Sequence, residues 1–100
     1  MNKIISTGNN MTNINCNNVY DIVFFWKHNK DDKEYKQYCG ETLCNVLGYT
    51  PPLSVKLVYE AAEKNRTLIF STRDINKAVE IRNTLNALDL SCQICPNNIQ

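Results

Sequence analysis

The sequence has little glycine, little proline and almost no excess of charge of either sign. Its 100 residues include three glycines, three prolines and one histidine. The glycines are isolated at positions 8, 40 and 48, which excludes the glycine-rich loops that hold phosphates or dinucleotides. Eleven basic and ten acidic residues give a formal charge of +1, far from the strongly basic balance of a dedicated nucleic-acid-binding protein. We therefore expect no nucleic-acid partner.

Long apolar runs are also missing. The longest covers residues 22–26, whereas a membrane-spanning helix needs about 20 residues. The first twenty residues contain no apolar signal-peptide core. We expect no membrane partner and a location in the cytoplasm or in the stroma of an organelle. With 43% hydrophobic and 21% charged residues, the chain has the material for one compact domain.

The five cysteines form an odd set, which favours reduced thiols over a disulfide framework. Cys92 and Cys95 make one CxxC pair, and a structural zinc site usually uses two such pairs. Cys39 and Cys44 would lie about 140° apart around a helix axis and chelate a metal poorly. We expect buried thiols, no metal and no other cofactor, with zinc as the minor alternative.

No constellation in the sequence is typical of catalysis. His28 is the only histidine, and neither a nucleophile-elbow pattern nor a second polar residue to orient it is present. The helix carboxylates are balanced by nearby lysines, and none is set apart in apolar sequence as acid–base chemistry requires. We therefore expect a protein without catalytic residues.

Residues 1–18 contain seven asparagines and a single charged residue, and this composition predicts a mobile tail. The folded domain is expected over residues 19–96, followed by a C-terminal tail over residues 97–100. Its first strand should cover residues 19–27, which are rich in β-branched and aromatic side chains.

Two helices should follow the first strand. The first is predicted to begin at Asp31, which has Glu34 three residues later, and to end at Gly48. The second is predicted to enter through Thr50 and the two prolines after it, because proline suits the first helical turn. Its expected inward stripe consists of Leu53, Leu57, Val58, Ala61 and Ala62.

The sequence after the second helix predicts a strand over residues 66–71 and then a third helix capped by Ser71 or Thr72. A last strand should cover residues 90–95 and stop before Pro96. The core residues of the third helix should be Ile75, Ala78, Val79, Ile81, Leu85 and Leu88. The order βααβαβ predicts a single α+β domain in which three helices pack on one face of a three-stranded antiparallel sheet.

This order, together with the segments VYDIVFF, KLVYEAAEKN and STRDINKAVEIRNTLNALDLSCQI, resembles the domain shared by bacterial ribosomal protein L7/L12 and the Clp protease adaptor ClpS. The resemblance covers residues 19–95 and is closer in layout to ClpS, which also has a flexible tail before one compact domain. It implies a non-enzymatic, protein-binding adaptor or modulator that delivers or regulates substrates of an AAA+ Clp-type protease.

The resemblance also implies a site. In the ClpS family a turn after the first strand binds the α-amino group of a substrate, and the first two helices supply an apolar pocket. The residues at or near the matching positions here are Asn29, Asp31, Asp32, Lys36, Leu43, Val58, Tyr59 and Ala62, with Lys36 at an apolar position of the family and Ala62 at a histidine position. A carboxylate is the acceptor that a charged amine requires.

Other interpretations stay open from the sequence alone. Asn29, Asp31 and Asp32 also fit a solvated loop with a helix cap. The expected partner is an AAA+ unfoldase, a peptide substrate or another protein complex. Alternatives are a translation-factor-binding module like that of the ribosomal stalk, with Lys36 and Lys56 at basic positions, and an inhibitor of a host complex encoded by a mobile element. The oligomeric state is undetermined.

Overall fold

The computed structural model describes residues 18–98 and contains three helices and three strands in the predicted order. The elements are β1 (Asn18–Phe25), α1 (Lys33–Leu47), α2 (Pro51–Lys64), β2 (Arg66–Thr72), α3 (Ile75–Ala87) and β3 (Cys92–Asn98). The predicted α+β class is therefore confirmed. The expected N-terminal tail lies outside the described residues except for Asn18, which begins β1, and residues 99 and 100 also lie outside them.

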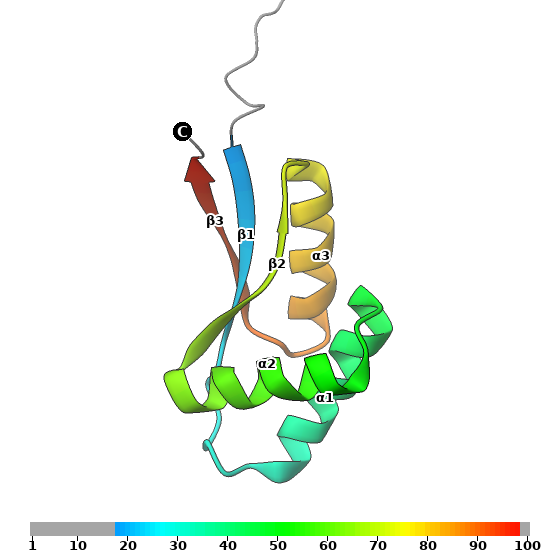
Figure 1. Ribbon diagram of the computed structural model, residues 1–100, viewed down its shortest axis with the longest axis vertical. Helices are drawn as coiled ribbons and strands as arrows, with labels where there is room; N and C mark the ends of the chain where they lie inside the picture. Colours follow the sequence, from blue (N-terminus) through cyan, green and yellow to red (C-terminus); the bar gives the residue numbers. More distant parts are fainter. Residues whose placement is uncertain (1–17, 99–100) are drawn as a thin grey trace, which may run out of the picture.

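The three strands form one sheet in the order β2-β1-β3, and β1 pairs antiparallel with both neighbours (Figure 1). Side chains alternate along β1, since Ile22 and Phe24 are fully buried whereas Val23 and Phe25 are half-buried. The register with β2 shifts between Ile22 and Val23, and the extra residue of β2, Ile69, is buried. The sheet thus has one apolar inner face.

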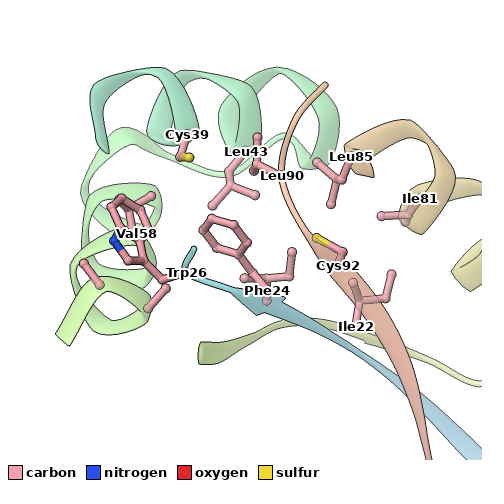
Figure 2. Packing of buried hydrophobic residues seen from close by; sticks show 13 residues of the cluster. Ile22, Phe24, Trp26, Cys39, Leu43, Val58, Ile81, Leu85, Leu90 and Cys92 are labelled. Atoms are coloured by element: carbon pink, nitrogen blue, oxygen red, sulfur yellow. The ribbon is translucent and has the colours of Figure 1, made fainter. Parts of the chain in front are cut away.

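All three helices contribute to the core on that inner face. Leu43 of α1, Val58 of α2 and Leu85 of α3 are each at most 1% exposed and belong to one cluster with Phe24 (Figure 2). Burying such a side chain contributes about 1.5–3 kcal/mol. The hydrophobic core therefore joins the helices to the sheet, and none of the helices in residues 18–98 lies on the sheet's other face.

Two helix caps differ from the sequence prediction. Asp32 rather than Asp31 is the N-cap of α1, because its Oδ1 accepts a hydrogen bond from the Tyr35 N–H at 3.0 Å. Asp74 rather than Ser71 or Thr72 caps α3, because β2 continues through Thr72. The Thr72 hydroxyl instead accepts from the Asp74 N–H at 3.1 Å.

The predicted end of α1 at Gly48 is confirmed, and α2 ends before Asn65. Gly48 and Asn65 have φ values of 73° and 74°, in the left-handed region that ends many helices. The prediction that β3 stops before Pro96 is wrong: Pro96 lies opposite Tyr20 on an edge strand, where a missing N–H is tolerated. Three side chains expected in the core are instead 39–42% exposed: Leu53, Ile75 and Leu88.

Candidate functional site

The turn after β1 uses most of its polar groups internally. The Asn29 side chain accepts from the Asp31 N–H at 2.8 Å, and the Asn29 carbonyl accepts from the Trp26 indole N–H at 3.2 Å. Asp32 caps α1 through one carboxylate oxygen, and its other oxygen lies 3.6 Å from Nδ1 of His28. Within residues 18–98, only Asp31 of this turn has an exposed carboxylate that no other side chain engages.

His28 is held over the first turn of α1 by ring stacking. Its ring centroid lies 3.5 Å from that of Tyr35, with an interplanar angle of 15°. The Tyr35 hydroxyl reaches across to the Asp89 carbonyl, so His28 completes a stack on a fixed ring. This arrangement orders the turn and gives the imidazole a structural role.

Three of the residues expected in a pocket are core residues. Leu43, Val58 and Ala62 are 0%, 1% and 4% exposed. Lys36 and Tyr59 lie together at the surface instead, with the lysine Nζ 4.4 Å from the ring centroid. The structure therefore divides the expected residues into a turn whose polar groups bond to one another, a buried set, and a surface pair of the half-buried Lys36 and the exposed Tyr59.

A groove of about 440 Å³ runs between α1 and α2, and Lys36 lies at one of its ends. The two helices are neighbours joined by residues 48–50, and α2 runs across the direction of α1 (Figure 1). Lys36 is one wall residue, and the groove continues past Gly40 toward the start of α2. The full lining is Lys36, Gln37, Gly40, Glu41, Cys44, Asn45, Pro51, Ser54 and Val55.

The groove is open because α1 has no side chain at Gly40. A Cβ placed there would meet nothing within 4 Å, so the missing side chain leaves space between the helices. The Cys44 Sγ lies 3.2 Å from the Ser54 Oγ, and this polar contact links the two walls. Val55 and Tyr59 follow each other at helical spacing on α2 and are 51% and 56% exposed.

The charges in the groove are few and opposite in sign. The Gln37 amide donates to Glu41 Oε2 at 3.2 Å, which holds that carboxylate along α1. Lys36 lies over the Tyr59 ring and forms no salt bridge with any of the described residues. The groove thus combines apolar surface with one ammonium group that has no carboxylate partner in residues 18–98.

The buried thiols lack the chemistry of nucleophiles. Removal from water raises the pKa of Cys39 and of Cys92 to about 12, so both stay protonated at neutral pH. Burial also raises the pKa of Tyr35 above its ordinary value. Among residues 18–98, no group of three or more His, Cys, Asp and Glu side chains is placed to hold a metal ion.

The sequence prediction missed most of the groove residues, including Gly40, Glu41, Cys44 and Val55. One signal was present, because an isolated glycine within a helical pattern costs up to about 1 kcal/mol relative to alanine and often has a packing or binding reason. The position of Val55 gave no such signal, since its exposure depends on how α2 is rotated against α1.

Within the described part of the chain, no helix has both the length and the apolar character to cross a membrane. Comparisons with protein-family models, with curated proteins and with solved structures found no match to this chain.

Proposed function

We propose that this protein is a non-enzymatic protein-binding adaptor whose α1–α2 groove holds a segment of a partner protein. The observation that carries the proposal is the open space at Gly40 in a groove that the exposed Val55 lines, with the exposed Tyr59 four residues further along α2. Recognition of an amphipathic segment in a groove between helices uses this combination of apolar surface and a polar rim. Aromatic residues such as Tyr59 often provide much of the binding energy at such surfaces.

The positive charge of Lys36 in the groove indicates which side chains the bound segment should carry. A carboxylate on the bound segment would pair with Lys36, whose ammonium has no acidic partner in the described structure. An apolar side chain two to four residues away would lie over Gly40. The partner segment we propose is therefore amphipathic and carries an acidic residue beside its apolar ones.

The resemblance to ClpS favours an AAA+ Clp-type unfoldase, or a substrate of one, as the protein that carries this segment. An L7/L12-like module would instead bind a translation elongation factor through the same two helices. An inhibitor from a mobile element would bind neither, but would bind a subunit of its target complex.

A capture experiment with two substitutions at one position tests the proposal. Full-length protein, Gly40→Leu and Gly40→Ala are used as bait in lysate of the source cells, and bound proteins are identified by mass spectrometry. Gly40→Leu fills the groove, whereas Gly40→Ala adds one methyl group at the same backbone position. A partner retained by wild type and Gly40→Ala but lost by Gly40→Leu supports the proposal. A partner retained by all three contradicts groove binding.

The identity of that partner separates the candidates. An unfoldase or its substrate supports the adaptor, and an elongation factor supports the stalk-like module. Lys36→Glu provides the second test, since it should weaken capture of an acidic segment and leave the fold intact. Capture that is unchanged by Lys36→Glu would remove the carboxylate from the proposed partner.

A further inference from the structure

The outer face of the sheet, opposite the helices, carries an ordered arrangement of charge and apolar surface. Antiparallel partners lie on the same face, so the register places Asp21 beside Ser71 and Cys95, and Val23 beside Leu68 and Gln93. Arg66 lies opposite Phe25. The face therefore has an acidic row, an apolar row and a basic row in succession along the strands.

The apolar row is accessible. Leu68 is 48% exposed, and it lines a shallow hollow with Val23, Cys95 and Arg66. Among residues 18–98, neither a helix nor a loop covers this hollow. Arg66 forms no salt bridge with any described residue. The Asp21 carboxylate accepts from the Ser71 hydroxyl at 2.7 Å, which fixes its position without neutralising its charge.

This pattern is complementary to itself. We infer that two copies of the chain associate through this face, related by a two-fold axis that lies between the sheets and runs across the strands. Asp21 and Arg66 are separated by about 13 Å along the strand direction, with Val23 and Leu68 midway between them. Reversing the strand direction in the second copy puts each Arg66 over the partner's Asp21 and each Leu68 near its counterpart. An isologous interface of this kind uses the same patch twice.

Two other properties of the chain favour a second copy of it as the partner that covers the outer face of the sheet. The formal charge of +1 gives little long-range repulsion between copies. Residues 1–17 carry no acidic side chain, so that segment has no carboxylate to offer Arg66. Because the helices lie on the other side of the sheet, a dimer would leave both α1–α2 grooves free and would bind two partner segments. The inference does not depend on the proposed function, since it concerns a different face.

A charge-exchange series tests the dimer. The full-length chain is studied under reducing conditions by sedimentation over a wide range of concentrations. We expect a monomer–dimer equilibrium that Leu68→Gln weakens by about tenfold or more, which corresponds to about 1.4 kcal/mol. Arg66→Glu and Asp21→Lys should each weaken it, and the double variant should restore it. Val55→Gln, on a similarly exposed position of α2, should leave it unchanged.

Other outcomes would overturn the inference. These are a monomer at every concentration, an equal effect of Leu68→Gln and Val55→Gln, or a double variant as weak as the single ones. If the full-length chain is monomeric and its Cys95 thiol is protected from alkylation, residues 1–17 cover the face instead. Circular dichroism of each variant distinguishes loss of the dimer from loss of the fold.

Discussion

The side-chain amide of Asn86 in α3 pairs with both backbone groups of Cys92, the first residue of β3. Its Oδ1 accepts from the Cys92 N–H at 2.7 Å, and its Nδ2 donates to the Cys92 carbonyl at 3.2 Å. On the other edge of the sheet, the Tyr49 hydroxyl donates to the Ile69 carbonyl at 2.6 Å. Each edge strand thus has backbone groups occupied by a side chain, which limits pairing with a further strand. The sheet is therefore better suited to contacts through its face than through its edges.

Replacing Asn86 by alanine should lower the free energy of unfolding by about 1–3 kcal/mol, because the buried backbone groups of Cys92 lose both partners. Asn83 is exposed on the same helix, and within residues 18–98 its side chain accepts hydrogen bonds only from Arg82. Asn83→Ala should therefore change stability by less than about 0.5 kcal/mol. Urea denaturation of both variants measures the difference. Equal effects would show that the Asn86 amide adds nothing beyond helix propensity.

The two aspartates of the turn after β1 should differ in their effect on stability. Asp32→Ala removes the N-cap of α1 and should cost about 1 kcal/mol, whereas Asp31→Ala should cost less than about 0.5 kcal/mol. If the turn binds an amine as the ClpS resemblance implies, Asp31→Ala should instead weaken capture of a peptide by its N-terminus. Thermal denaturation and peptide titration of the same two variants separate the roles. Peptide binding that neither substitution changes would exclude the turn from the site.

The space at Gly40 predicts that substitution there leaves the fold intact. Gly40→Ala should raise the free energy of unfolding by about 0.5–1 kcal/mol, because alanine restricts the unfolded chain and a Cβ meets no atom within 4 Å. Gly40→Leu should fold as well, since its side chain extends into the groove. Urea denaturation provides the comparison. A Gly40→Leu variant that is less stable than wild type by more than about 2 kcal/mol would show that the groove is closed in solution.

The stability of the protein should fall in alkaline solution. In the unfolded chain a cysteine thiol ionises with a pKa of 9.0, whereas burial raises the pKa of Cys39 to about 12. Below pH 9 the thiol is protonated in both states and its full contribution is present. Between pH 9 and 12 the unfolded state binds fewer protons, so the free energy of unfolding falls by up to about 1.4 kcal/mol per pH unit for each such thiol. Cys92 behaves in the same way.

The variant Cys39→Ala isolates this contribution. Urea denaturation at a series of pH values under reducing conditions should give a shallower alkaline slope for Cys39→Ala than for wild type. Identical slopes would mean that the Cys39 thiol ionises as easily in the folded protein as in the unfolded chain.

The order of helices and strands could be predicted from the sequence because the residues that begin and end the helices act locally. Gly48 ends α1, and the two prolines after Thr50 begin α2, because backbone restrictions act within a few residues. The N-caps of α1 and α3 differ from the predicted residues because several neighbouring side chains are able to cap each helix. For α3, the end of β2 at Thr72 decides which residue is the cap. Leu53 and Ile75 lie in the first turns of their helices, and a periodic pattern alone does not show that the core ends before them.

The candidate site was harder to predict from the sequence than the fold. Lys36 and Tyr59 were both expected at a binding site, and the structure brings them together. The groove beside them depends on the distance and rotation between two packed helices, which local patterns do not determine. The face with Asp21, Leu68 and Arg66 likewise depends on the strand register, including the shift between Ile22 and Val23.

Photo-crosslinking from the groove is the most direct test of the central claim. A photoreactive phenylalanine analogue replaces Val55 in one full-length variant and Asn83, an exposed residue of α3, in a matched control. We predict that the Val55 position forms a covalent adduct with a discrete partner in source-cell lysate, that the Asn83 position does not, and that adding Gly40→Leu abolishes the adduct. Equal crosslinking from both positions, or an adduct that persists with Gly40→Leu, would contradict binding in the α1–α2 groove.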